Sequence, residues 1–117
     1  MITGVHAVIY ANEPDAVRAF FRDVLGLASI DAGGTWPIFA LPPAELGIHP
    51  TEGADGTELF LLCDDIEVAL AELRAKGIHT TGPVRDLSWG WLVELEVTES
   101  FRLGMYQPKH LSPHHPE

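Results

Sequence analysis

The sequence predicts an α+β fold built from two copies of one unit, in which a strand is followed by a helix and three more strands. Two observations support this prediction. Shifting the sequence by 52 residues aligns the apolar segment 58–63 with 6–11, and the amphipathic segment 65–76 with the one that follows residue 13. Both amphipathic segments end at a glycine, Gly26 in the first copy and Gly77 in the second. A period close to half of the 117 residues indicates a duplicated unit.

The first copy carries clear helix boundaries. Asn12 can accept a hydrogen bond as an N-cap, and Pro14 has no N–H group to leave unpaired in the first turn. Gly26 can adopt the left-handed conformation that ends a helix. We therefore expect a strand over 2–11 and a helix over 14–25. The shorter apolar segments predict three further strands over 28–30, 35–41 and 44–49.

The second copy repeats this order after a Gly-, Asp- and Pro-containing segment, residues 50–56. Asp64 is the expected cap of a helix over 65–76, which has an apolar stripe at helical spacing. The clearest alternation lies at 89–98, with Trp91, Val93 and Leu95 on one face and Glu94 and Glu96 on the other. The predicted strands of this half cover residues 57–63, 80–84, 89–98 and 101–107.

The length and composition predict one domain over 1–117, with module one at 1–50, a linker at 50–56, module two at 57–108 and a flexible tail at 109–117. No apolar run reaches the roughly 20 residues of a membrane helix, and no secretory signal precedes the first strand. The single cysteine, Cys63, excludes an internal disulfide and fits a reducing compartment. We therefore expect a cytoplasmic protein.

The formal net charge of −10 argues against some partners. It opposes nucleic acid, which rewards a basic face, and it disfavours anionic membrane surfaces. It would favour a cationic ligand by long-range attraction. The alternative is that the acidic residues only keep the protein soluble.

This arrangement resembles the vicinal oxygen chelate superfamily, whose members include glyoxalase I, extradiol dioxygenases and bleomycin-binding proteins. The resemblance covers roughly residues 2–108. It is carried by H-x-x-x-Y and FFRDVLGL in the first half, and by CDDIEVALAELRAKGI, the WGW strand and LGMYQPKH in the second. It implies a glyoxalase-like fold, in which two modules form a curved mixed sheet around a pocket. It also implies a homodimer whose pocket lies near the subunit interface.

Metal-using members of that superfamily take ligands from the first and last strands of each module. Carried onto this sequence, the first-strand positions are His6 and Glu58. The last-strand position of module two, normally a glutamate, falls on Gly104, which has no side chain. The position of module one falls on Leu46 or Gly47, where His49 or Glu45 can stand in by alternation. The alternative metal site therefore consists of His6, His49 and Glu58 around a divalent ion (Fe, Mn, Ni or Zn).

Aromatic side chains are frequent on the predicted strands, and rings that line a curved sheet can bind a planar or amphipathic molecule. Trp89 and Trp91 flank Gly90, where a ligand or a backbone can approach closely. Many of these rings can equally belong to the core. The candidate ligand-binding residues are His6, Tyr10, Trp36, Phe39, His49, Glu58, Phe60, Trp89, Trp91 and Tyr106.

No other catalytic arrangement is evident. Cys63 lies between a strand and a helix, where a helix N-terminus can lower a thiol pKa, but a small core residue fits the position as well. We therefore expect metal-independent sequestration of a small aromatic or cationic molecule, similar to that by the bleomycin-resistance proteins, with no cofactor. The competing hypothesis is a metal-dependent lyase, isomerase or dioxygenase.

Overall fold

The computed structural model describes residues 6–31 and 37–115. In chain order, these residues form two α-helices, one π-helical turn and six strands: α1 (Pro14–Ala19), η1 (Phe20–Val24), β1 (Ser29–Asp31), β2 (Pro37–Phe39), β3 (Phe60–Leu62), α2 (Ile66–Ala75), β4 (His79–Leu87), β5 (Gly90–Glu96) and β6 (Arg102–Pro108). The expected strand–helix–strands order is complete in the second half of the chain. In the first half it is present only in part.

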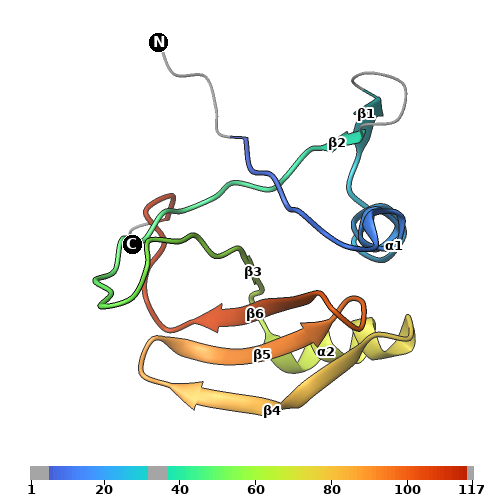
Figure 1. The fold of residues 1–117 in the computed structure, drawn as a ribbon. Helices are drawn as coiled ribbons and strands as arrows, with labels where there is room; N and C mark the ends of the chain where they lie inside the picture. The colour runs from blue at the N-terminus through green and yellow to red at the C-terminus, as the bar shows by residue number, and fades with distance from the viewer. Residues whose placement is uncertain (1–5, 32–36, 116–117) are drawn as a thin grey trace.

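The second half forms a four-stranded sheet with the strand order β3-β6-β5-β4. β3 runs parallel to β6, and the other neighbours are antiparallel. A bulge between Thr81 and Arg85 interrupts β4, where Gly82 has a φ of +77° and Pro83 cannot donate to a ladder. Figure 1 shows α2 behind this sheet, so that one face of the sheet is covered by a helix of the same half.

Helix α2 has the boundaries that its sequence predicts to within a residue. The carboxylate of Asp65, rather than the expected Asp64, accepts hydrogen bonds from the backbone N–H groups of Glu67 and Val68. Its neighbour Ile66 donates its backbone N–H to Gln107 Oε1 of β6 at 3.1 Å. At the other end, Gly77 has a φ of +85°, as a helix-ending glycine requires.

The first helix is less regular than expected. It begins at Pro14, but its N-cap is Glu13 and no side chain caps it, so the expected role of Asn12 was wrong. After Ala19 the backbone widens into η1, where Leu25 N–H donates to Phe20 O. Gly26 ends the helical segment with a φ of +70°, as expected. The expected continuous α-helix over 14–25 is thus an α-helix followed by a π-helical turn.

Two expected strands of the first half are not formed in the part of the chain that the structure describes. Residues 6–11 and 44–49 make no strand, and 35–41 is reduced to β2, which pairs with β1 alone. The physical reason is that a strand needs a neighbour, and no strand formed by the described residues pairs with either segment. Their apolar side chains therefore stay exposed, Tyr10 to 90% and Ile48 to 87%.

The buried core joins the two halves. The helix-facing side of the sheet and α2 supply seven of its residues, and the first helical segment supplies three: Val17, Phe20, Phe21, Ile66, Leu70, Leu73, Val93, Leu95, Leu103 and Met105. The C-terminal ends of the helices also meet, because Lys76 Nζ donates to Val24 O at 2.7 Å. These two residues are 52 positions apart, the period of the sequence repeat. Among the described residues, no helix is long and apolar enough to cross a membrane.

Candidate functional site

One face of the four-stranded sheet is not covered by α2, and we call it the open face. Alternation along each strand places the buried residues Val93, Leu95, Leu103 and Met105 toward α2 and their neighbours on the other side. The residues of the open face that line a large cleft come from all four strands: Phe60, Thr81, Arg85, Leu92, Glu94, Arg102 and Gly104.

An aromatic cluster stands on this face. The ring of Trp89 lies 4.9 Å from that of Tyr106 and 6.4 Å from that of Phe60, in edge-to-face geometry. Phe60 and Tyr106 meet in the same way at 5.7 Å. Such ring pairs are more stable than their buried area alone would predict, so the three rings form a well-packed aromatic surface. Trp89 is still 40% exposed and can contact a ligand.

Two glycines make room for these rings. A Cβ at Gly104 would lie 2.6 Å from Phe60 Cδ1, and a Cβ at Gly90 would lie 2.9 Å from Tyr106 Cδ2 and 2.7 Å from the Gln107 carbonyl oxygen. The register explains the first contact, because Gly104 pairs directly with Phe60. Close approach at Gly90 was expected from the sequence, and the group that approaches is the neighbouring strand with its tyrosine.

The cleft has a volume of about 2110 Å³ and extends from the open face to the first half of the chain. Beside β3 it is lined by Glu58, and from the first half it is lined by His6, Tyr10 and Phe39. The Phe39 ring lies 5.9 Å from that of Phe21, so this side of the cleft is anchored in the core. A drug-sized ligand typically occupies about 300–1,000 Å³, so the cleft is wider than such a ligand needs.

The structure thus brings together six of the candidate ligand-binding residues along the cleft: His6, Tyr10, Phe39, Glu58, Phe60 and Trp89. Tyr106 joins them through its ring contacts with Phe60 and Trp89. Trp91 lies on the opposite face, packed against the core with Lys109 Nζ 4.4 Å from its ring centroid. His49 is exposed outside the cleft lining, and Trp36 lies outside the described residues.

The alternative metal site is not assembled within this chain. His6 and Glu58 both line the cleft but His49 does not, and among residues 6–31 and 37–115 no three His, Cys, Asp or Glu side chains gather to hold an ion. Gly104, where the resemblance implies a glutamate ligand, offers no donor atom. The Phe60 ring occupies the space that a side chain at Gly104 would need. The residues present therefore do not fit the four-ligand pattern.

A polar network lies beside the aromatic cluster. The Tyr106 hydroxyl lies 3.1 Å from His110 Nε2, and Glu45 Oε1 lies 3.6 Å from the same nitrogen. Burial, followed by the charge of Glu45, raises the pKa of Tyr106 above its usual value. Tyr106 is thus a neutral phenol near pH 7 rather than a nucleophile. The network holds the segment after β6 against residue 45 of the first half, and His114 Nε2 reinforces it at 2.7 Å from Ala44 O.

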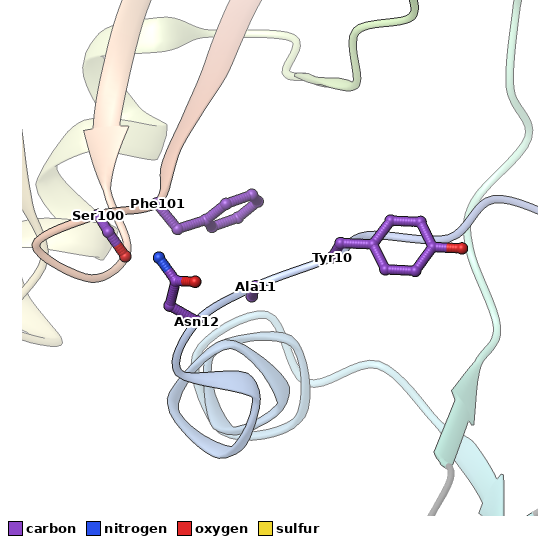
Figure 2. Close-up of a pocket in the computed structure, with 5 residues that line it drawn as sticks. All are labelled: Tyr10, Ala11, Asn12, Ser100 and Phe101. Atoms are coloured by element: carbon purple, nitrogen blue, oxygen red, sulfur yellow. The ribbon is translucent and has the colours of Figure 1, made fainter.

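A second, smaller pocket of about 190 Å³ lies where the first helix begins, beside the turn between β5 and β6. Figure 2 shows Asn12 turned toward Ser100, while the Tyr10 ring points away from both. Asn12 therefore lines this pocket instead of capping the helix. The volume is below that of typical ligand sites, so the large cleft is the candidate site.

Cys63 is a free thiol that packs against the core. Burial, followed by the charges of Asp64 and Asp65, raises its pKa to about 11. The thiol is therefore protonated at neutral pH, and the core interpretation holds over the activated one.

Sequence reasoning identified Glu58 but missed the arginines of the cleft. Arg18, Arg85 and Arg102 line it together with Glu58 and Glu94. The alternation of 101–107 was enough to group Arg102 with Gly104 and Tyr106. Arg85 lies beyond the end of the strand expected over 80–84, because β4 continues through the bulge to Leu87.

Comparison with known proteins agrees with this architecture. No family model matches the sequence, and no curated protein matches it. Among solved structures, the antibiotic-binding protein TnmS3 from Streptomyces sp. CB03234 is 20% identical, with a TM-score of 0.65 over 92% of this chain and 98% of that chain. A lactoylglutathione lyase from Agrobacterium tumefaciens is 19% identical, with a TM-score of 0.63 over 90% and 92% of the two chains.

A protein of unknown function from Agrobacterium tumefaciens str. C58 is 13% identical, with a TM-score of 0.61 over 92% of this chain and 94% of that chain. Similarity at this level of identity establishes the fold and leaves the activity open. The chain has the glyoxalase-like α+β fold that the sequence predicts.

Proposed function

We propose that this protein binds and sequesters a small aromatic organic molecule in the large cleft, without a metal ion and without turnover. The observation that carries the proposal is the aromatic cluster of Phe60, Trp89 and Tyr106 on the open face, with Trp89 partly exposed to the cleft. Binding would remove free ligand by mass action. The antibiotic-binding neighbour on the same fold is consistent with such a role.

The metal-free part of the proposal is supported by the surroundings of Gly104. A residue without a donor atom stands where the resemblance implies a ligand, and an aromatic ring fills the space above it. An aromatic surface favours stacking over ion coordination. We keep the metal-dependent lyase, isomerase or dioxygenase as the hypothesis to be excluded by experiment.

We also propose that a second copy of the chain closes the cleft. Residues 6–11 and 44–49 have strand-like sequences but lack a strand neighbour in this chain, and Val8, Tyr10, Leu46 and Ile48 are exposed. The cleft is also too wide for one small ligand. A homodimer would bury these apolar side chains and narrow the site. The cytoplasmic location remains a prediction.

The binding proposal is tested by titration with N-phenyl-1-naphthylamine, a neutral aromatic probe whose fluorescence rises in apolar surroundings. Trp89→Ala should weaken binding about three- to tenfold, the value of an aromatic contact. Trp91→Phe is the control, since Trp91 lies on the opposite face. Equal loss in both variants, or no binding at all, would contradict the proposal.

The metal-free and dimeric parts have their own tests. Elemental analysis of untagged protein purified without chelator should find no stoichiometric metal, and about one Fe, Mn, Ni or Zn per chain would favour the enzyme hypothesis.

Light scattering after size exclusion should give twice the mass of one chain. Ile48→Asp should lower that mass, whereas Val68→Asp on α2 should not. A wild-type monomer would contradict closure by a second copy.

A further inference from the structure

The net charge of the residues that line the cleft differs in sign from the net charge of the whole chain. The chain has seven Lys and Arg against seventeen Asp and Glu, yet the described lining of the cleft contains three Arg and two Glu. Charged groups farther from a bound ligand than the Debye length, about 8 Å at physiological salt, are largely screened from it. The local charges of the lining therefore decide which ligand is favoured, rather than the net charge of −10.

Two of the three arginines are already paired. Arg18 Nη1 lies 3.2 Å from Asp15 Oδ1. Arg102 donates to Thr81 Oγ1 at 2.9 Å and lies 3.6 Å from Glu96 and 3.8 Å from Glu94. Arg102 is thus shared between Glu94 and Glu96, and these contacts hold its side chain along the sheet.

Arg85 is different. Within residues 6–31 and 37–115, its guanidinium makes no hydrogen bond, ion pair or ring contact, although it lines the cleft. It pairs in register with Leu92, which in turn pairs with Tyr106 of the aromatic cluster. A guanidinium presents several donors in a planar fork that matches carboxylate, sulfonate or phosphate oxygens.

Within the described residues, Glu58 is the acidic residue of the cleft lining that has no ion-pair partner. The strand order separates Glu58 from Arg85. β4 and β3 are the two edges of the sheet, so Arg85 lies at one edge and Glu58, two residues before β3, lies near the other. Three strand spacings separate these edges, about 14 Å. The aromatic cluster and Leu92 occupy the surface of the strands between them. Glu58 is therefore too far across the sheet to neutralise Arg85.

We infer that Arg85 is a specificity-determining residue that binds an acidic group of the ligand, so that the cleft selects an aromatic molecule carrying a carboxylate, sulfonate or phosphate. This inference rests on the proposed binding function and names its ligand class. It replaces the cationic ligand that the net charge of the sequence suggested. The aromatic body lies over Phe60 and Trp89, and the acidic group points toward the β4 edge.

The test compares two probes that share one ring system. 1-Anilinonaphthalene-8-sulfonate carries a sulfonate, and N-phenyl-1-naphthylamine lacks it. The wild-type protein should bind the sulfonate about tenfold more tightly, the value of one charge-assisted contact. Arg85→Gln should remove this advantage and leave the affinity for the neutral probe unchanged. The matched control is Arg74→Gln, which makes the same charge change on the exposed side of α2.

Equal affinity of the wild-type protein for both probes, or equal effects of the two arginine variants, would overturn the inference while the proposed function stands. Failure of both probes to bind would instead overturn the proposed function, and the inference with it. Raising the salt concentration gives a second measurement. The advantage of the sulfonate should shrink with salt in the wild-type protein and stay absent in Arg85→Gln.

Discussion

The two halves of the chain share one sequence pattern and yet differ in how completely they fold around it. The second half contributes seven of the ten buried core residues, and the first half contributes three. Of the exposed large hydrophobic side chains within residues 6–31 and 37–115, seven belong to the first half and four to the second. The same order of strand and helix therefore produces a packed layer in one half and an open one in the other.

The difference lies in strand pairing rather than in the helices. Both helical segments end at a glycine with positive φ, and these glycines are one residue away from matching positions of the repeat. The strand before α2 pairs with β6, whereas residues 6–11 before α1 pair with no strand in the described chain. Strand formation depends on neighbours and on a covered face more than on local preference. The comparison thus teaches that a strand-like sequence becomes a strand only where a neighbouring strand is available to pair with it.

The largest expected effect comes from replacing a leucine by alanine in each half, because one of the two leucines is buried and the other is exposed. Leu95→Ala should lower the free energy of unfolding by about 2–5 kcal/mol, because Leu95 is fully buried between the sheet and α2. Leu46→Ala should change it by less than about 0.5 kcal/mol in a single chain, since Leu46 is exposed. Urea unfolding measures both. A large effect of Leu46→Ala that depends on protein concentration would instead indicate a partner over the first half.

The next effect compares two glycines that each follow a leucine, Gly47 in the first half and Gly104 in the second. Gly104→Ala should cost about 1–3 kcal/mol, because its Cβ would overlap the Phe60 ring. Gly47→Ala should be nearly neutral, since its Cβ would meet only the mobile end of exposed His49 at 3.3 Å. Thermal unfolding compares the two variants. The double variant Phe60→Ala/Gly104→Ala should cost less than the sum of its parts, and strict additivity would refute the overlap.

A smaller effect is expected at the starts of the helices. Asp65→Ala should cost about 1 kcal/mol, because its carboxylate accepts from two backbone N–H groups of α2. Asn12→Ala should have no measurable cost, since no side chain caps α1. Circular dichroism during urea unfolding checks both. Equal costs would show that Asn12 does cap the first helix.

The smallest effect concerns Cys63, which stands where the first half has Ala11. Its pKa is raised to about 11 in the folded chain, so the unfolded chain releases this proton first as the pH rises. The associated stability is therefore present at neutral pH and is lost between the ordinary thiol pKa and about pH 11. Absorbance of the thiolate at 240 nm should have its midpoint near pH 11 in the folded protein and near the ordinary value in guanidinium. An unshifted folded midpoint would contradict burial as the cause.

The candidate site could be predicted from the sequence only in part. Phe60, Trp89 and Tyr106 were identified because aromatic residues on adjacent strands can share a face. Trp91 was included with them, although the alternation that groups it with Val93 and Leu95 also predicts a core position. Arg85 was missed because the expected strand ended at residue 84, whereas β4 continues to Leu87 and places Arg85 on the same face as Thr81.

The sequence by itself determined the local structure of this protein. The glycines at 26 and 77, the cap before α2 and the alternation in β5 act over a few residues, so their consequences can be read along the chain. Only the tertiary structure decided which expected strands found neighbours, which ring lies over Gly104, and which charges line the cleft. These features depend on pairing between residues up to about half the chain apart. A pairing of that kind is decided by the partner and its register, and neither is contained in a local pattern.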